Sequence, residues 1–268
     1  MIDSPYRIEP GSKIDLRDWP TDDTGKFKDK AEAKPDVEKN LTKLIELQDL
    51  LYASGKHALL IVLQAMDAGG KDGAISHVFS GVNPQGCSVT SFKVPTHEEL
   101  AHDYLWRYHM ACPRRGMIGI FNRSHYESVL VERVHGIVPE KVWSKRFEQL
   151  NHFEHLLNNE NTLVLKYFLH ISKKEQKKRL EARLEDPTKN WKFDPSDLAE
   201  RKHWDDYMLA WKDILRYCST DDAPWFVVPS DHKWFRNWVL SDTIVRTLEK
   251  LKMEYPEPVK GLDKIRVK

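Results

Sequence analysis

The sequence predicts an α/β protein in which a mostly parallel sheet is covered by helices on both faces. Short apolar segments alternate along the chain with longer segments of helical periodicity, and strands that alternate with helices in this way form parallel sheets. The apolar segments are also continuous, which is typical of strands buried on both faces. The 268 residues suffice for one large domain or two small ones.

In the first half of the chain, a polar arm precedes a helix and a strand. Residues 1–36 are rich in Asp, Lys, Pro and Gly, so we expect an extended arm that packs on the outside or is partly disordered. A helix is predicted from Val37, because apolar residues recur at three- and four-residue spacing. The apolar run after His57 predicts the first buried strand. A helix over 72–79, a strand over 87–92 and a helical stretch over 96–110 follow.

The second half continues the alternation. Residues 117–121 read MIGIF and predict a buried parallel strand, which is followed by a helix over 141–159. The apolar run over 162–170 predicts another core strand, and the run over 225–228 predicts the last one. No internal repeat or low-complexity segment interrupts this order.

Composition bounds the class of protein. Charged residues make up 31% of the chain and the net charge is +1, so we expect a protein with a charged surface whose basic sites are local. No segment approaches the roughly eighteen apolar residues of a membrane span. The three cysteines, Cys87, Cys112 and Cys218, lack the spacing of a metal or redox motif, so we expect buried thiols in a reducing compartment. A cytoplasmic protein that binds no membrane is the resulting expectation.

The segment over 57–73, HALLIVLQAMDAGGKDG, carries the clearest chemical signal. A buried strand brings the chain to the edge of the sheet, glycines allow backbone N–H groups to converge on an anion, and Lys71 adds a positive charge where a helix begins. This arrangement predicts a phosphate-binding loop. Compared with the consensus G-x-x-x-x-G-K-[ST], Ala65 replaces a glycine and Asp72 replaces the hydroxyl residue. A carboxylate can take over the magnesium-binding task of that hydroxyl; the alternative is an ordinary strand–turn–helix.

Polar residues follow the other strands as well. Ligands of parallel sheets bind beyond the carboxyl ends of the strands, and the chain places there Asp67, Lys71, Asn122, Arg123, Ser124, His125, Tyr126, Glu127, Ser172, Lys173 and Lys174. Arg123 and Lys71 suit phosphate oxygens, and Asp67 and Glu127 are candidate metal ligands or bases. Alternatively, Arg123 pairs with Glu127 on the surface and Tyr126 packs in the core.

The segment over 173–211 is strongly basic and is a candidate lid. Phosphoryl transfer requires negative charge to be neutralised and water to be excluded, and an arginine on a closing element does both. Arg179 and Arg183 are four residues apart and would share one helix face. The alternative is a solvated helix held by pairs of Glu and Lys.

Several blocks in order resemble the polyphosphate kinase 2 family over roughly residues 37–255. They are LQAMDAGGKDG, GVNPQG, VPT, DYLWR, IFNRSHYESVLVERV, FLHISKKEQKKRL, NWKF and DDAPWFVVP. The resemblance implies a P-loop kinase-like α/β/α sandwich, similar to thymidylate kinase, with a helical lid over about 173–211. It divides the chain into an arm (1–36), a catalytic domain (37–255) and a tail (256–268). It also implies a homodimer or homotetramer.

The resemblance implies roles for particular residues. Asp67 would be the essential carboxylate, Lys71 would steady the transferring phosphoryl group, and Arg183 resembles the lid arginine. Mg²⁺, or alternatively Mn²⁺, would be held by Asp67 and Asp72. The other residues implied to bind nucleotide or phosphate are Ala68, Gly69, Gly70, Asp72, Gly73, Asn122, Arg123, Glu127, Arg133 and Arg179.

Two positions differ from other family members, which carry aspartate at 122 and asparagine at 127. Asn122 and Glu127 resemble the subgroup that accepts AMP as well as ADP. The implied reaction is reversible: the end phosphoryl group of polyphosphate passes to ADP or AMP and forms ATP or ADP.

Other expectations concern the substrates. Polyphosphate is a polyanion, so we expect a basic groove, with Arg107, Arg114, Arg115 and Arg133 as candidates. Trp106 and Tyr126 are candidates for clamping the base. Two alternatives remain, a nucleotide kinase that uses ATP as donor and a non-enzymatic RNA-binding module. The second alternative leaves Asp67 without a role, and we expect no nucleic-acid partner.

Overall fold

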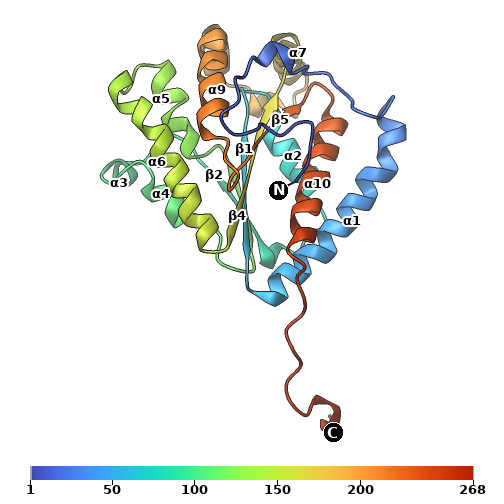
Figure 1. The fold of residues 1–268 in the computed structure, drawn as a ribbon. Coiled ribbons are helices and arrows are strands. Elements are labelled where there is room, and N and C mark those ends of the chain that lie inside the picture. Colours follow the sequence, from blue (N-terminus) through green and yellow to red (C-terminus); the bar gives the residue numbers. More distant parts are fainter. Residues whose placement is uncertain (1, 268) are drawn as a thin grey trace.

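The computed structural model describes residues 2–267 and contains one sheet of five parallel strands (Figure 1). The strand order is β2-β3-β1-β4-β5, and all neighbouring strands are parallel. The strands are β1 (Ala58–Gln64), β2 (Cys87–Ser91), β3 (Ile118–Asn122), β4 (Thr162–His170) and β5 (Trp225–Pro229). The predicted α/β class and the five strand positions are confirmed.

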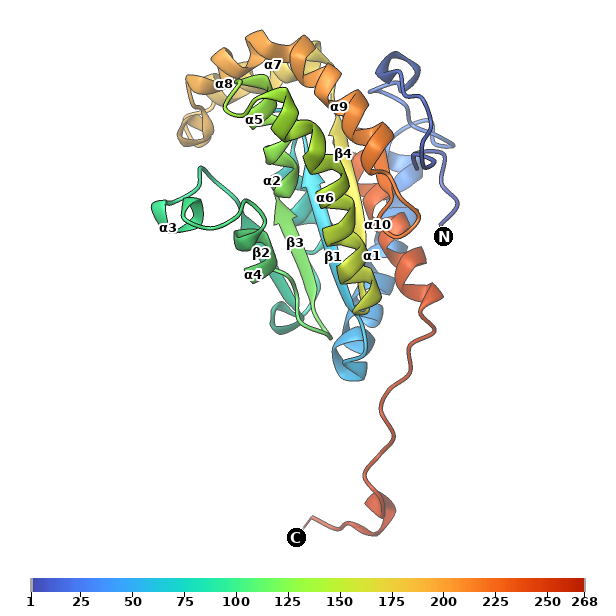
Figure 2. The same cartoon turned by 60° about the vertical axis from the view of Figure 1, so that its left-hand side comes forward.

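Helices cover both faces of the sheet and make three layers (Figures 1 and 2). They are α1 (Lys30–Ser54), α2 (Lys71–Val78), α3 (His97–Leu100), α4 (Trp106–Met110), α5 (Val131–Val134), α6 (Glu140–Asn159), α7 (Lys173–Glu185), α8 (Ser196–Glu200), α9 (Trp204–Cys218) and α10 (Lys233–Lys250). Helices α1, α2 and α10 pack on one face, and α6 and α9 pack on the other. Helices α7 and α8 lie beyond the carboxyl ends of the strands (Figure 2).

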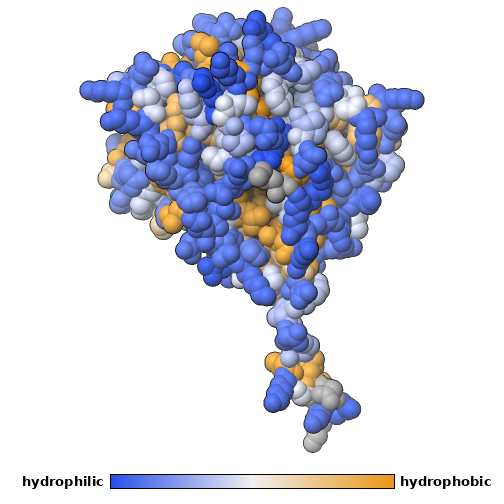
Figure 3. All heavy atoms as spheres, in the orientation of Figure 1, coloured by the Kyte–Doolittle hydropathy of each residue, from blue (hydrophilic) through white to orange (hydrophobic). Residues whose placement is uncertain are grey.

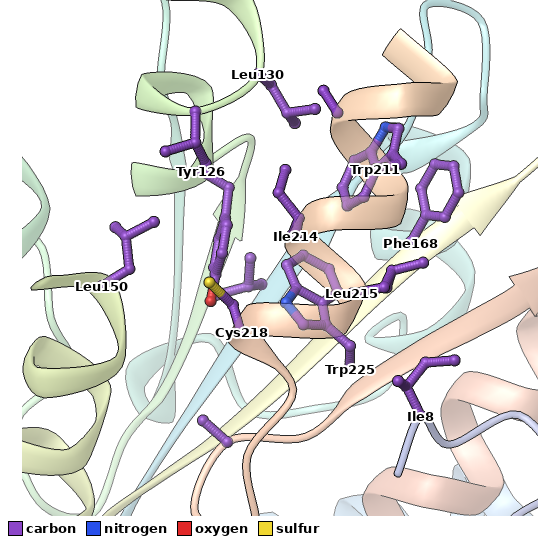
Figure 4. Close-up of a cluster of buried hydrophobic side chains, with 14 of the residues drawn as sticks. Ile8, Tyr126, Leu130, Leu150, Phe168, Trp211, Ile214, Leu215, Cys218 and Trp225 are labelled. Carbon is purple, nitrogen blue, oxygen red and sulfur yellow. The ribbon is translucent and has the colours of Figure 1, made fainter. Parts of the chain in front are cut away.

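Alternating side chains of β1 supply two separate cores. Leu59, Ile61 and Leu63 pack with α1, α2 and α10, while Leu60 and Val62 pack with α6 and α9, because successive strand residues point to opposite faces. Every residue of β1 is buried. Figure 4 shows the second core, where aromatic rings from α9 and the sheet pack closely, with Trp211 stacked on Phe168. Strand β1 is thereby held rigidly at the centre of the sheet.

The N-terminal arm covers the outer edge of β5. Ile8 donates its N–H to the carbonyl of Trp225 at 2.9 Å, and Val227 donates to the carbonyl of Tyr6 at 2.8 Å. Tyr6 and Ile8 are buried. The arm therefore satisfies the backbone groups that an exposed edge strand would leave unpaired.

Three elements differ from the sequence-based expectation. Helix α1 begins at Lys30 instead of Val37, because Asp29 caps its N-terminus by accepting from the N–H groups of Ala31 and Glu32. The stretch over 96–110 is not one helix: its chain turns around Asp103, which accepts from the N–H groups of both Leu105 and Trp106 and separates α3 from α4. Helix α10 was not predicted.

Surface features agree in part with the expectations. None of the helices in residues 2–267 is long and apolar enough to cross a membrane. The three cysteines are free, but only Cys218 is fully buried, whereas Cys87 and Cys112 are half-buried. The face shown in Figure 3 is predominantly hydrophilic. The tail after α10 extends away from the domain (Figure 1).

Candidate active site

The segment between β1 and α2 is a tight loop with an open helix N-terminus. Ala68 and Gly70 have positive φ angles of 57° and 100°, which turn the backbone sharply. Helix α2 begins at Lys71, and no side chain caps its first turn. Its first N–H groups have no acceptor within the helix and are available to an anion. This is the backbone arrangement of a phosphate-binding loop.

Gly69 permits the close approach of this loop to the end of β1. A Cβ atom at position 69 would lie 2.4 Å from the Ala65 Cβ and 2.7 Å from the Met66 carbonyl oxygen.

Gly69→Ala should lower the free energy of unfolding by about 1–3 kcal/mol, because the backbone around Met66 would have to shift to admit the methyl group. The measurement is urea denaturation. Gly73→Ala is the matched control, because its Cβ would make only an ordinary contact of 3.7 Å. Equal stability of the two variants would contradict the tight loop.

Charged groups from two strand ends meet at the loop. Lys71 Nζ donates to the carbonyl of Ala65 at 3.1 Å, and burial, followed by the charge of Arg123, lowers the pKa of Lys71. Arg123 donates to the carboxylate of Asp67 at 3.0 Å and thereby links the two strand ends. The alternative interpretation was a surface pair of Arg123 with Glu127. Glu127 remains close enough to oppose the lowering of the Lys71 pKa.

Arg123 is held in a backbone conformation that side chains seldom adopt. Its φ is 64°, and such strain persists only where neighbouring residues fix it, commonly at functional sites. Its N–H donates to the carbonyl of Leu63 at 3.1 Å, and the next residue, buried Ser124, accepts from Gln64 at 3.1 Å. Beside it, Asn122 donates to Asp72 at 2.7 Å, which places the predicted metal ligand Asp72 at the same strand end.

Behind Arg123 lies a buried polar cluster that the sequence analysis did not identify. Lys166 Nζ donates to the carboxylate of Glu154 and, at 2.8 Å, to the Tyr126 hydroxyl. Glu154 also accepts from His125 at 3.0 Å and from Tyr126 at 2.8 Å. Burial would raise the pKa of Glu154, but Lys166 and His125 outweigh burial and hold it below its usual value. The lysine within the apolar run of β4 was the sequence signal that could have indicated this cluster.

Two predicted lid arginines are placed differently from each other. Arg179 is buried under the loop and donates to the carbonyls of Ala68 at 3.2 Å and Gly69 at 3.0 Å. Its guanidinium therefore packs against the loop backbone, and its phosphate-binding role stays a prediction. Arg183 instead pairs with Asp197 of α8 at 3.0 Å. Burial, followed by the charge of Asp67, raises the pKa of Asp197, so this pair lies near the site.

The predicted lid segment also includes part of a core helix. Trp211, near its predicted end, is 1% exposed and belongs to α9. Burial of this kind is incompatible with a mobile element. Before α9, the segment leaves the large side chains of Trp191 and Leu198 exposed.

Three other arginine candidates lie on α5 and before β3. Arg133 pairs with Asp213 at 2.8 Å, and its phosphate-binding role stays a prediction. Arg114 and Arg115 precede β3, at the amino end of the sheet, where Gly116 donates to the His57 carbonyl. These two arginines therefore lie at the end of the sheet opposite to the loop, and their place in a polyphosphate groove stays a prediction.

The two aromatic candidates and Arg107 contact other residues of the fold. Tyr126 cannot clamp a base, because it is 0% exposed and packs on Trp225; its alternative role in the core is confirmed. Trp106 is half-buried and stacks on His102. Arg107 donates to the Lys93 carbonyl and to the Tyr108 hydroxyl.

Arg236 of α10 is a loop contact that the sequence analysis missed altogether. It is 2% exposed and donates to the carbonyl of Gly70 at 3.0 Å. The segment around it was not predicted as a helix, so no pattern connected it with a loop far away in the sequence. Only the three-dimensional fold brings the two together.

The parallel sheet, the glycine loop after β1 and the Lys71–Arg123–Asp67 group define a phosphotransferase of the P-loop kinase-like class. The family model described as "Polyphosphate kinase 2 (PPK2)" matches residues 27–256. The chain therefore belongs to the polyphosphate kinase 2 family.

Full-length relatives support the same assignment. The chain is 51% identical to the AMP/ADP-polyphosphate phosphotransferase of Meiothermus ruber, over 97% of this chain and 98% of that protein. It is 46% identical to the ADP-polyphosphate phosphotransferase of Rhodopseudomonas palustris, over 94% and 91% of the two chains. The crystal structure of polyphosphate kinase 2 from Arthrobacter aurescens TC1 superposes with a TM-score of 0.92 at 40% identity, covering 96% of this chain and 93% of the other.

Proposed function

We propose that this protein transfers the terminal phosphoryl group of inorganic polyphosphate to ADP, and also to AMP, forming ATP and ADP. The observation that carries the choice of substrates is the likeness, over 97% of the chain, to a protein named AMP/ADP-polyphosphate phosphotransferase. The loop and its charges support phosphoryl transfer. Neither an ATP-dependent nucleotide kinase nor an RNA-binding module is favoured by the relatives.

The site residues divide the work of an in-line displacement. An oxygen of the acceptor's terminal phosphate attacks the end phosphorus, and the bond to the remaining polyphosphate breaks as the new bond forms. Lys71 and Arg123 neutralise charge on the transferring group, and the N–H groups at the start of α2 hold its oxygens. The shortened polyphosphate leaves with the bonding electron pair, so no covalent enzyme intermediate is needed.

A divalent metal fits the carboxylates at this site. Asp67 and Asp72 lie on either side of Lys71 in the chain, and Asp72 is exposed. Residues 2–267 contain no group of three or more acidic, His or Cys side chains that could hold a metal without substrate. Mg²⁺ commonly binds one or two carboxylates together with substrate phosphates. We propose Mg²⁺, with Mn²⁺ as a substitute; when bound, it would neutralise phosphate charge.

The lid and the assembly are also proposals. The exposed part of the segment before α9, residues 186–203, is suited to close over the substrates, with Arg183 at its base. The family resemblance supports a homodimer or homotetramer. The composition supports work in the cytoplasm, without nucleic-acid or membrane partners.

The donor and the acceptors can be tested together. The pure protein is incubated with Mg²⁺ and either long-chain polyphosphate or ATP as the donor, with AMP or ADP as the acceptor, and the nucleotides are separated by chromatography. We expect ATP from ADP, and both ADP and ATP from AMP, when polyphosphate is the donor. Products that form only with ATP as donor would identify an ATP-dependent nucleotide kinase instead.

A further inference from the structure

Arg236 is a buried cation whose hydrogen-bond acceptors are neutral. Its side chain donates to the Gly70 carbonyl at 3.0 Å through Nη1, and to Asn237 Oδ1 at 3.1 Å through Nε and 2.8 Å through Nη2. Burial, followed by the neighbouring charge of Arg179, lowers the pKa of Arg236 to about 10. A buried charge without a partner of opposite sign is costly for the folded state, so its presence here calls for a functional reason.

The guanidinium groups of Arg236 and Arg179 lie together on one side of the phosphate loop. A Cβ atom built on Gly70 would be 2.2 Å from Nη1 of Arg236 and 3.4 Å from Nη1 of Arg179. Gly70 is therefore needed both for its positive φ and for this close approach. Arg179 is neutralised by Glu175, which accepts from it at 2.8 Å.

The two arginines bind three successive carbonyl groups of the loop. Arg179 donates to the carbonyls of Ala68 and Gly69, and Arg236 donates to that of Gly70. Residues 2–267 contain no cis peptide bond, and in a trans peptide the N–H points opposite to the C=O. Holding the Gly69 and Gly70 carbonyls therefore directs the N–H groups of Gly70 and Lys71 to the other side of the loop.

Those two N–H groups stand where an anion would bind. Gly70 is the N-cap of α2 and Lys71 is its first residue, positions whose N–H groups have no acceptor within the helix. A cation that donates to the carbonyl of a peptide also polarises that peptide, which makes its N–H a stronger donor. The buried charge thus acts on the anion through the backbone.

We propose that Arg236 is a positioning residue for phosphoryl transfer. It fixes the peptide between Gly70 and Lys71 so that its N–H faces the transferring phosphoryl group, and Asn237 fixes the guanidinium in turn. The proposal rests on the function proposed above.

If Arg236 served only the stability of the fold, its replacement would destabilise the protein. The Gly70 carbonyl also accepts the helical hydrogen bond of Ala74 at 2.9 Å, so it keeps a donor when Arg236 is removed. Replacing the buried charge by an apolar side chain of similar length should therefore leave the free protein about as stable as before. Activity should fall nevertheless.

The test compares Arg236→Met and Arg236→Lys with Arg246→Met in the full-length protein. Arg246 is on the same helix but is half-exposed and pairs with Asp242 at 3.3 Å. The measurements are kcat and KM for ADP with polyphosphate as donor, the melting temperature, and the rise in melting temperature caused by inorganic tripolyphosphate.

For Arg236→Met we expect kcat to fall on the order of 10²-fold with little change in KM. The melting temperature of the free protein should change little, while its rise with tripolyphosphate should shrink. The kcat of Arg236→Lys should lie between those of the wild type and Arg236→Met, because an ammonium keeps the charge but lacks the fork that also binds Asn237. Arg246→Met should behave as the wild type.

Two results would overturn the proposal. One is an unchanged kcat in Arg236→Met; the other is a loss of kcat that follows only the fraction of unfolded protein. If Arg236→Met does not fold, Arg236→Lys decides: wild-type kcat in that variant would show that no fixed fork is required. A wild type without polyphosphate-dependent activity would refute the proposed function, while the tripolyphosphate shifts would still test Arg236.

Discussion

Lys71→Met is expected to lower the rate of phosphoryl transfer by about 10³-fold while the protein remains folded. The side chain lies at the first residue of α2 with Nζ turned back toward the end of β1, 3.1 Å from the Ala65 carbonyl. In that position it can neutralise charge that spreads over the transferring group. A 10³-fold loss corresponds to about 4 kcal/mol of transition-state stabilisation.

Stability should be nearly unaffected by this change. Burial and the charge of Arg123 lower the pKa of Lys71, which means that the folded state disfavours the charged form. Removing the charge therefore sacrifices no electrostatic stabilisation of the free protein. The measurement is kcat with polyphosphate and ADP, together with the melting temperature. Lys43→Met, at an exposed pair with Glu46 on α1, is the control, and equal activity of the two variants would exclude Lys71 from the reaction.

Lys166→Met is expected to have the largest effect on folding, a loss of about 3–5 kcal/mol in the free energy of unfolding. Lys166 and Glu154 are both completely buried, and without Lys166 the buried Glu154 carboxyl would lose the cation that offsets its burial. For a domain of this size, the melting temperature should fall on the order of 10 °C.

A double-mutant cycle separates the charge effect from packing. In Lys166→Met/Glu154→Gln, the amide oxygen can still accept from His125 and Tyr126, which donate to Glu154 in the wild type, and no buried charge is left unpaired. The double variant should therefore be more stable than Lys166→Met alone, as measured by urea denaturation. Destabilisation equal to the sum of the two single changes would refute a coupled ion pair.

The cluster also links stability to the site. His125 and Tyr126 lie two and three residues after Arg123, and both are fully buried and donate to Glu154. The strained backbone of Arg123, with its φ of 64°, is thus held from below by the core. Destabilising the cluster should loosen the position of Arg123.

Much of the fold could be predicted from the sequence because the signals were local. The run over 162–170 is apolar at most of its positions, and it forms β4 with the predicted bounds. The loop signal was also local: the glycines and Lys71 stand together in the chain and lie together in the structure. Convergence of Asp67 and Arg123 followed from one general rule about parallel strand ends.

What could not be predicted depends on contacts between distant segments. Arg236 reaches Gly70 from another helix, and nothing in the sequence near either residue indicates the contact. The contact of Arg179 with the loop was not predicted, since a helix face alone does not say whether a side chain meets solvent or a loop. The start of α1 was missed because its first turns carry mostly exposed polar residues, and the cap at Asp29 was the only local sign.

The central claim is most directly tested by the rate of ATP formation from polyphosphate and ADP in the wild type and in Asp67→Asn, measured side by side. Asparagine preserves the size of the side chain and an oxygen that can accept from Arg123, as Asp67 does at 3.0 Å, but it removes the charge that we propose holds a metal and orients phosphate. We predict ATP formation by the wild type and a loss of at least about 10³-fold in the variant. Equal rates in the two proteins, or no ATP from polyphosphate with the wild type, would contradict the account.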